Sequence, residues 1–391
     1  MISALSRPYI DASVPVLRAH GVAITTAFYA NMFAAHPELT KLFNMANQAN
    51  GAQQQSLAAA VFAYAANIGN PAALGPVVTR IVHKHVSLGI KAEHYPIVGR
   101  YLIGAIKEVL GEAATPALLA AWDEAYHSLA QLFIEAETAL YAQAGIEPGQ
   151  LRAMRVAAIN KESADVVSIA LQPADGLPLP AFKPGQYLSC AAHFEDGGRQ
   201  LRQYSLSDAP GAQHLRISVK RERADARPHG QVSNWIHDRL EVGSLLQVSH
   251  PFGDFTPDTE ASAPIVLLSA GVGITPMISA LNHIARVNPQ RQVVFGHAAR
   301  SADHHAHRAD LAAAQRLMPN LRVATFYESS PPQTHMEAAL LPDWPRAEAD
   351  VYLCGPLGFM RQQWTGLVQA GVPVQRLHRE MFGPELLDHL L

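Results

Sequence analysis

The spacing of apolar residues changes twice along the chain, and this change limits the folds that it can adopt. Over residues 1–142 apolar side chains recur every three or four positions, as at Val78 and Ile81, which predicts helices. From about Arg155 the chain has short β-rich stretches, and from Pro264 strands alternate with helical stretches. We therefore expect a multidomain protein with an all-α domain, an antiparallel β-barrel and an α/β domain with a parallel sheet.

These changes also predict the domain boundaries. We expect the domains to span residues 1–142, 150–256 and 262–391 of the 391 residues. The stretch AQAGIEPGQLRAM would link the first two domains. Thr115 followed by Pro116 predicts a helix start, because threonine caps helices and proline suits their first position.

Composition excludes several classes of protein. The net charge of −3 gives no reason to expect a nucleic acid or an anionic membrane as partner. The apolar run PIVLLSAGVGI is shorter than the roughly 18 residues of a membrane-spanning helix, and the N-terminus does not look like a signal peptide. Cys190 and Cys354 lie far apart and predict no disulfide framework. We expect a cytoplasmic protein.

The stretch HKHVSLGIKAEHY, from His83 to Tyr95, contains three histidines. His85 is in phase with Val78 and Ile81, so we expect it to face an apolar interior, whereas His83 should face solvent. Two interpretations of His85 remain open. It is either a core histidine bonded to a carbonyl group or an axial ligand of haem iron.

Glu137 favours the second interpretation. It lies on an otherwise apolar helical stripe with Phe133, where an unpaired charge would be costly, whereas Glu135 lies off the stripe and should be solvated. A buried acid beside His85 would fix the tautomer of the imidazole and raise its basicity. Tyr95, at the start of the next helix, would complete the network.

Two short motifs in the β-rich region suit a flavin. RQYSL, from Arg202 to Leu206, follows KPGQY and offers a guanidinium for a pyrophosphate, an aromatic face for a flat ring and a hydroxyl. In HGQVSNWIHDRL, Gly230 to Ser233 predict a tight turn before a helix, whose N–H groups suit a phosphate. The alternative is a plain β-barrel with a surface arginine.

The stretch PIVLLSAGVGITPM suits a dinucleotide. A buried-type strand ends at Gly271-x-Gly273, and Thr275-Pro276 open a helix whose N-terminus favours a phosphate. The third glycine of the usual fingerprint is absent. No acidic residue follows the second strand, and Arg300 stands there instead, which mildly favours NADPH.

The first 140 residues resemble the haem domain of the flavohaemoglobins, through FYANMFAAHPELTKLFNMANQANGAQQQSLAAAVFAYAANI, HKHVSLGIKAEHYPIVGRYL and AWDEAY. The RQYS, PGQY and GQVSNW elements resemble the flavin barrel of the ferredoxin-reductase superfamily, and GVGITP and CGP resemble its nucleotide domain. The resemblance implies one haem b with His85 as the proximal iron ligand. It places Tyr95 and Glu137 around that histidine, Tyr29 and Gln53 on the distal side, and Phe43 and Leu57 against the haem and its ligand.

The resemblance also implies one FAD and NAD(P)H as cosubstrate. The residues expected to contact FAD are Tyr187, Arg202, Gln203, Tyr204, Ser205, Gly230, Gln231, Val232 and Ser233. The residues expected to contact the nucleotide are Gly271, Val272, Gly273, Ile274, Thr275, Pro276, Cys354, Gly355 and Pro356. In the closing segment, made of Met381, Phe382, Gly383 and Pro384, Phe382 would lie over the flavin ring until nicotinamide displaces it. Glu380 and Lys84 would lie between flavin and haem and tune both potentials.

The function implied by the resemblance is that of a nitric oxide dioxygenase, in which electrons pass from NAD(P)H through FAD to haem, and haem-bound oxygen converts nitric oxide to nitrate. The expected partners are O2 and nitric oxide, and the expected state is a monomer. One alternative is a general NAD(P)H-dependent haem reductase that serves peroxides or external acceptors. Another is an oxygen or nitric oxide sensor or carrier, although a carrier has no need of RQYS or GVGITP and no signalling domain is seen.

Two features depart from the family pattern. The linker lacks the usual glycine-tryptophan element, and Arg379 stands where a tyrosine usually precedes the glutamate. We expect Arg379 to affect the flavin potential or the nucleotide preference.

Overall fold

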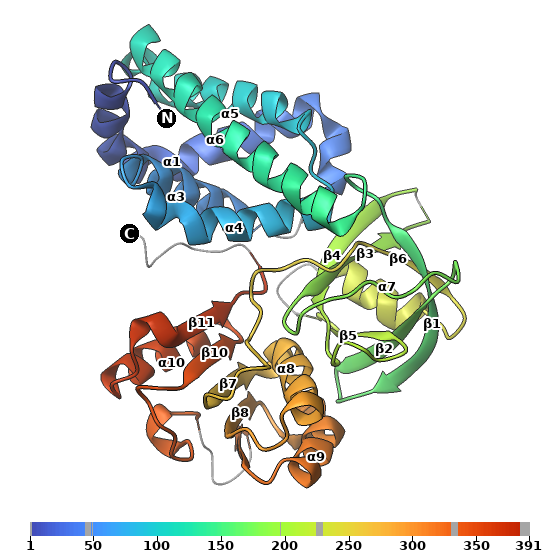
Figure 1. The fold of residues 1–391 in the computed structure, drawn as a ribbon. Coiled ribbons are helices and arrows are strands. Elements are labelled where there is room, and N and C mark those ends of the chain that lie inside the picture. The colour runs from blue at the N-terminus through green and yellow to red at the C-terminus, as the bar shows by residue number, and fades with distance from the viewer. Residues whose placement is uncertain are drawn as a thin grey trace. The chain divides into compact units, whose positions relative to one another are not determined.

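The structure, a computed structural model, describes residues 2–43, 48, 50–195, 197–223, 230–329 and 335–383. The chain divides into two compact units. Unit 1 comprises Met1–Gln150, His193–Leu201 and Gly383–Leu391, and unit 2 comprises Leu151–Ala192 and Arg202–Phe382. Figure 1 shows the elements of both, and each unit is described by itself.

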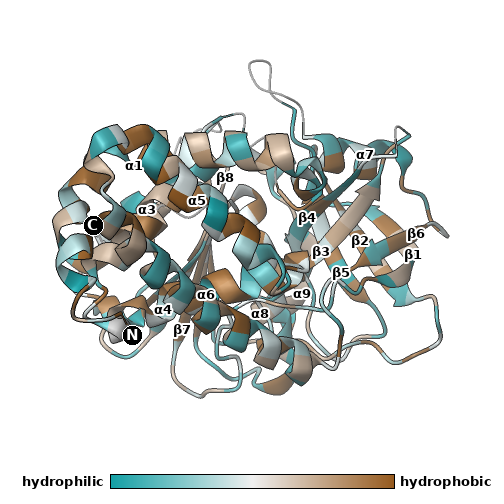
Figure 2. Cartoon of the chain, turned by 90° about the horizontal axis from the view of Figure 1, so that it is seen from above, coloured by the Kyte–Doolittle hydropathy of each residue, from teal (hydrophilic) through white to brown (hydrophobic). Residues whose placement is uncertain are grey.

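Unit 1 is helical, as the sequence predicts. Its elements are α1 (Arg7–Ala35), η1 (Pro37–Lys41), α3 (Ala52–Ala66), α4 (Pro71–Leu88), α5 (His94–Leu110), η2 (Gly111–Ala113) and α6 (Pro116–Ala144). Helix α1 packs against α3 and α5, and α6 packs against α4 and α5. Figure 2 shows hydrophobic and hydrophilic residues interspersed along these helices, as expected where one face of each helix is buried. Phe28, Met32 and Trp122 lie in the main apolar core of this unit.

Helix ends in unit 1 follow from particular residues. The Thr115 side chain accepts a hydrogen bond from the Leu118 N–H at 3.2 Å, and Pro116 takes the first helical position, so the predicted start of α6 is confirmed. Gly89 ends α4 with φ +78°, and a Cβ atom there would lie 2.5 Å from Gly149 Cα. Only glycine fits this position, because it adopts the left-handed backbone and leaves room for the linker.

The first sheet of the chain is antiparallel and six-stranded, with the order β4-β3-β6-β1-β2-β5. Its strands are β1 (Arg152–Lys161), β2 (Val166–Pro173), β3 (Tyr187–His193), β4 (Arg199–Ser205), β5 (Leu215–Lys220) and β6 (Leu245–Val248), and α7 (Gln231–Arg239) precedes β6. The apolar alternation predicts all of these strands except β4. In β4 polar residues are too frequent for the pattern to show.

The second sheet is parallel and five-stranded, with the order β11-β10-β7-β8-β9. Its elements are β7 (Ile265–Ala270), η3 (Gly271–Gly273), α8 (Ile274–Val287), β8 (Val293–Ala299), η4 (Ala302–His304), α9 (Arg308–Leu317), β9 (Leu321–Tyr327), η5 (Ala338–Leu340), β10 (Asp350–Cys354), α10 (Leu357–Gln369), η6 (Val374–Arg376) and β11 (Leu377–Glu380). Every residue of β7 is buried, as expected for a central parallel strand. Two apolar clusters pack against this sheet, so the predicted fold class is confirmed.

Among the described residues, no helix combines the length and the apolar character that crossing a membrane requires.

Candidate functional site

Three polar side chains meet in the interior of unit 1. His85 lies in the last turn of α4, Tyr95 in the first turn of α5 and Glu137 on α6. The His85 Nδ1 atom lies 2.7 Å from Glu137 Oε1, and the Tyr95 hydroxyl donates to the same oxygen at 2.6 Å. Glu137 is 2% exposed, so its charge is stabilised by these two partners and not by water.

The protons of this network can be assigned. Burial, and then the Glu137 carboxylate, raise the pKa of Tyr95 far above its usual range, so the hydroxyl keeps its proton and donates it to Glu137. The His85 Nδ1–H therefore donates to Glu137 as well. No described residue bonds to Nε2, and the His85 side chain is 32% exposed. A neutral imidazole with its Nδ1 proton held by an acid and its Nε2 lone pair available is the donor that haem iron takes, so this site fits a haem.

The burial of α4 differs from the prediction in detail. The face that carries Val78, Ile81 and His85 is only half-buried, whereas Val82 and Val86 are each 3% exposed. His83 is half-buried as well, so exposure alone does not separate it from His85, and the prediction that it faces solvent stays a prediction. The prediction for Glu135, which is exposed, is confirmed. The apolar periodicity thus identified the side of α4 that faces the core, but it did not identify Val82 and Val86 as its most buried residues.

A second polar group in unit 1 contains the residues expected on the distal side. Tyr29 is 4% exposed on α1, and its ring packs edge-on against Phe43 at 5.7 Å. Burial raises the pKa of Tyr29 to about 12, against the opposing effect of hydrogen bonds with Gln53 and Gln48. Tyr29 and Gln53 are thus brought together, and Leu57 packs against the same core.

Gln48 is a polar residue near Tyr29 that the sequence did not single out. Its side chain accepts a hydrogen bond from Gln54 Nε2 at 3.0 Å. It belongs to no periodic stripe, because it precedes α3, and glutamine is common on helix surfaces. No signal in the single sequence distinguishes it from Gln55.

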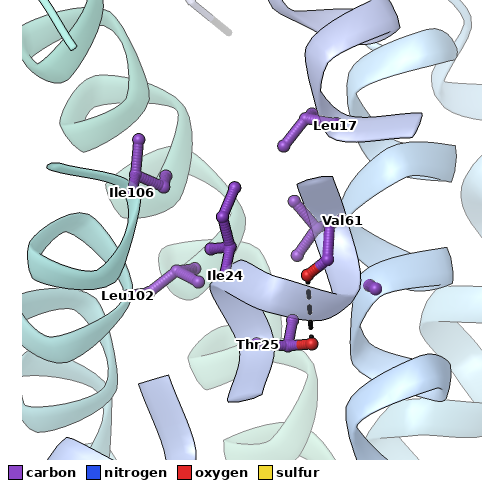
Figure 3. Close-up of a pocket in the computed structure, with 8 residues that line it drawn as sticks. Leu17, Ile24, Thr25, Val61, Leu102 and Ile106 are labelled. Atoms are coloured by element: carbon purple, nitrogen blue, oxygen red, sulfur yellow. Dashed lines mark hydrogen bonds between the residues drawn. The ribbon is translucent and has the colours of Figure 1, made fainter. Parts of the chain in front are cut away.

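An apolar cavity of about 10 Å³ lies between α1, α3 and α5 (Figure 3). It is lined by Leu17, Gly21, Ile24, Thr25, Ala58, Val61, Leu102 and Ile106. The Thr25 hydroxyl donates to the Gly21 carbonyl at 3.1 Å, so it needs no ligand. A space of this size holds at most about one water molecule, and its apolar lining should keep it dry. We interpret it as a packing defect of the core.

The residues expected to hold FAD lie on β3, β4 and α7 of the antiparallel sheet. Tyr187 opens β3 and is 7% exposed, and Arg202, Gln203, Tyr204 and Ser205 end β4. Burial raises the pKa of Tyr204 above its usual range and lowers that of Arg202. Half-buried tyrosine and arginine side chains at the end of one strand fit a flat ring that carries a negatively charged chain.

The prediction that Gly230 to Ser233 form a tight turn before α7 is wrong, because most of this stretch is already helical. Gly230 is the N-cap, and Gln231, Val232 and Ser233 already form the first helical turn. The Ser233 hydroxyl donates to the Gly230 carbonyl at 3.0 Å and accepts the Glu222 N–H at 3.2 Å. The N–H groups at this helix start still suit a phosphate, because the first turn leaves them without helical partners.

The two motifs expected to bind the nucleotide adjoin each other. A Cβ atom on Gly273 would lie 2.3 Å from the Cys354 carbonyl oxygen, and one on Gly355 would lie 2.8 Å from the Phe359 ring. The sequence explained Gly273 by the approach of a phosphate, but the structure gives a second reason, which is the approach of the Cys354–Pro356 loop. Ile274, Thr275 and Pro276 open α8 as predicted, and the Thr275 hydroxyl donates to the Val272 carbonyl at 3.0 Å.

The closing segment is described only in part. Glu380, at the end of β11, is 5% exposed, and its carboxylate accepts the Met381 N–H at 2.9 Å. Phe382 is 49% exposed, and Pro384 lies outside the described residues. Lys84 belongs to unit 1 and Glu380 to unit 2, so their common position between flavin and haem stays a prediction.

The two arginines noted in the sequence have protein partners. Arg300 pairs with Asp165 at 2.9 Å and remains 62% exposed. The Arg379 guanidinium lies over the Trp364 ring, 5.8 Å from its centre. Their effect on nucleotide preference or flavin potential stays a prediction.

Three family models match the chain in the order of these sites. They describe a globin over residues 26–132, an oxidoreductase FAD-binding domain over 153–256 and an oxidoreductase NAD-binding domain over 267–364. Among curated proteins, the flavohemoprotein of Bordetella parapertussis is 47% identical and covers 98% of this chain and 99% of that protein. The flavohemoprotein of Rhizobium meliloti is 44% identical over 99% of each.

Two solved structures are similar. The flavohemoglobin of Malassezia yamatoensis, solved with bound FAD and haem, has a TM-score of 0.87 and 32% identity and covers 98% of this chain and all of that one. The FAD/NAD-binding domain of the nitric oxide dioxygenase of Vibrio cholerae has a TM-score of 0.56 and 36% identity, and it covers 60% of this chain and 99% of that one.

Proposed function

Because this chain belongs to the flavohemoprotein family, we propose that it is a nitric oxide dioxygenase that oxidises nitric oxide to nitrate with O2 and NAD(P)H. The observation that carries the proposal is the His85–Glu137 pair. It leaves one imidazole nitrogen for a metal in a chain whose other domains match FAD- and NAD-binding oxidoreductases. We further propose that the protein is a cytoplasmic monomer.

When bound, haem would supply an iron that can hold oxygen, and FAD would supply a carrier that takes up two electrons and releases them singly. His85 would hold the iron through Nε2. Glu137 holds the Nδ1 proton of His85 and so raises the basicity of the imidazole, and Tyr95 fixes the position of Glu137.

On the distal side Tyr29 and Gln53 supply polar groups. Since the pKa of Tyr29 is raised to about 12, its hydroxyl stays protonated at neutral pH and can donate to a bound ligand. Phe43 and Leu57 limit the room for water. In unit 2 Arg202, Tyr204 and Ser205 hold FAD, and the two loops around Gly273 and Gly355 hold the nucleotide.

The first test is removal of nitric oxide at an electrode by the chain loaded with haem and FAD. Fast removal that requires both O2 and NADH or NADPH supports the proposal. Slow removal despite normal oxygen binding would favour the alternative of a haem reductase that serves another acceptor, or that of a sensor or carrier. Omitting the nucleotide and omitting oxygen are the two controls.

Tyr29→Phe tests the distal assignment. Loss of one hydrogen bond, worth about 1 kcal/mol, should speed oxygen dissociation roughly fivefold, as measured by stopped-flow spectroscopy. The matched control is Tyr64→Phe, because the Tyr64 hydroxyl donates to the Ala125 carbonyl at 3.1 Å and has no predicted role at the haem. An unchanged rate in Tyr29→Phe would remove Tyr29 from the distal role.

A further inference from the structure

His307 lies where the antiparallel sheet and the parallel-sheet domain of unit 2 meet. It is the N-cap of α9 and is 0% exposed. Its backbone is left-handed, with φ +60°, which no other described residue except glycine adopts. A histidine is held in such a conformation only where its surroundings fix it. No motif and no predicted role involves it.

Both ring nitrogens of His307 lie close to polar side chains, which come from α9 and from the antiparallel sheet and its connections. The Nδ1 atom lies 2.9 Å from Asp310 Oδ2 on α9 and 3.7 Å from Glu162 Oε2, just after β1. The Nε2 atom lies 2.9 Å from the Ser218 hydroxyl on β5. The imidazole therefore joins α9 to two strands of the antiparallel sheet.

Hydroxyl groups extend the contact beyond Ser218. The Ser218 hydroxyl lies 2.8 Å from that of Ser207, and the Ser207 hydroxyl donates to the Arg216 carbonyl at 3.2 Å. Because the Asp310 carboxylate can only accept, Nδ1 of His307 donates to it. His307 is thus hydrogen-bonded at both ring nitrogens, to Asp310 on α9 and to Ser218 on β5.

Asp310, the partner of His307 at Nδ1, is itself held by two other elements. Arg216, on β5, donates to Asp310 Oδ1 at 2.9 Å, and Asn282, on α8, donates to the same oxygen at 2.9 Å. Burial would raise the pKa of Asp310, but His307 and Arg216 hold it well below its usual range. The other titratable groups nearby are His297 on β8, His305 before α9 and Arg308 at the start of α9.

A metal ion does not explain the cluster better. Glu162, His307 and Asp310 could together ligate an ion, since their donor atoms lie within 4.8 Å of one another. However, the Arg216 guanidinium already pairs with Asp310, and both nitrogens of His307 already have protein partners. Hydrogen bonds and an ion pair within the protein thus account for the cluster.

The network ends beside the strand expected to hold the flavin. Ser207 follows Ser205, the last residue of β4, by two positions, and the Arg216 guanidinium also donates to the Ser207 carbonyl. We propose that His307 is a positioning residue whose imidazole, bonded at both nitrogens, fixes α9 on β5, and so sets the nucleotide domain against the flavin strand for hydride transfer. This inference rests on the proposed function, and β5, α8 and α9 can be followed in Figure 1.

The test uses Ser218→Ala and His307→Gln in the full chain loaded with FAD and haem. Ser218→Ala removes one hydroxyl and keeps every charge and the start of α9, so it decides the matter if His307→Gln does not fold. The matched control is Ser279→Ala, because the Ser279 hydroxyl donates to the Asp208 carbonyl at 2.8 Å and joins the same two domains without His307.

The first readout is flavin reduction by NADPH and by NADH in a stopped-flow instrument. Misplacing the reacting groups lowers the limiting rate more than the affinity, so we expect a rate about tenfold lower with a nearly unchanged nucleotide Kd in both variants. Ser279→Ala should stay within about twofold of the unsubstituted chain. Equal limiting rates in all three variants would overturn the proposal.

The second readout does not depend on activity. Nuclear magnetic resonance of isotope-labelled histidine should show a changed shift of His307 Nε2 in Ser218→Ala, because this nitrogen loses its partner. Amide exchange in Leu215–Lys220 should be faster in Ser218→Ala. An unchanged Nε2 shift with unchanged amide exchange would contradict the proposal. If NADPH and NADH fail to reduce even the unsubstituted chain, the proposed function fails, whereas the resonance experiment still decides whether Ser218 holds His307.

Discussion

His85 and His307 are both held by a carboxylate at Nδ1, at 2.7 Å and 2.9 Å, yet they lie in different environments. At His85 the other nitrogen has no partner among the described residues, and the side chain is 32% exposed. At His307 the other nitrogen is bonded to Ser218, and the side chain is 0% exposed. The partner at Nε2, not the acid, separates a residue suited to bind a metal from one that joins two domains.

The backbone sharpens this comparison. His85 lies in the last turn of the regular helix α4, whose backbone fixes the direction of its side chain. His307 lies at a helix start with a left-handed backbone, where hydrogen bonds to separate elements determine its position. The accessible nitrogen of His85 is thus presented by a regular helix, whereas the buried contacts of His307 depend on an irregular backbone position.

The largest expected effect is that of His85→Ala. Without Nε2 the iron has no proximal ligand, so this variant should lose haem or show an abnormal haem spectrum. His83→Ala is the matched control, because His83 lies on the same helix and is also half-buried. A normal haem spectrum in His85→Ala would show that His85 Nε2 does not bind the iron. The proposed difference between His85 and His307 would then be wrong.

The sequence predicts the His85 site well because the site follows helical periodicity. Glu137 stands out as a carboxylate on an apolar stripe, and His85 is in phase with its apolar neighbours. The structure brings the two together as expected. The change from helical to alternating to mixed spacing likewise predicts the three kinds of fold, apart from β4, whose polar residues hide its alternation.

The sequence does not predict the His307 site, for a physical reason. Its partners Glu162 and Ser218 lie 145 and 89 positions away along the chain, on other elements. Neither His307 nor these two partners interrupts an apolar stripe in the way that Glu137 does. Contacts of this kind depend on how sheets and helices pack, which local spacing does not encode.

Asp310→Asn should have the next largest effect. Because its pKa is held low, the Asp310 carboxylate stabilises the fold above its unfolded-state pKa and loses this contribution as the pH falls toward its folded value. Asp310→Asn takes the carboxylate away from Arg216 and His307 in a buried site, which should lower the free energy of unfolding by about 3 kcal/mol at neutral pH. The deficit should shrink below about pH 4.

Urea unfolding of the full chain, followed by the fluorescence of released FAD, measures this difference at each pH. The matched control is Asp175→Asn, because Asp175 pairs with Arg152 at the surface, where water screens the charges and the loss should be small. A deficit for Asp310→Asn that stays constant with pH would mean that the carboxylate is not the group that holds His307.

Tyr95→Phe should have the smallest effect, and it tests whether the acid alone is enough at His85. The variant removes the hydroxyl that donates to Glu137 but leaves the bond of 2.7 Å between His85 and Glu137. Loss of one hydrogen bond, worth about 1 kcal/mol, should speed haem loss roughly fivefold, measured by transfer of haem to a competing apoprotein. Glu137→Gln is the reference for a larger effect, up to about 100-fold, because it removes the charge itself. If Tyr95→Phe released haem as fast as Glu137→Gln, the tyrosine would be as necessary to His85 as the acid. The position of His85 would then depend on Tyr95 as well as on Glu137, just as that of His307 depends on a partner at each of its nitrogens.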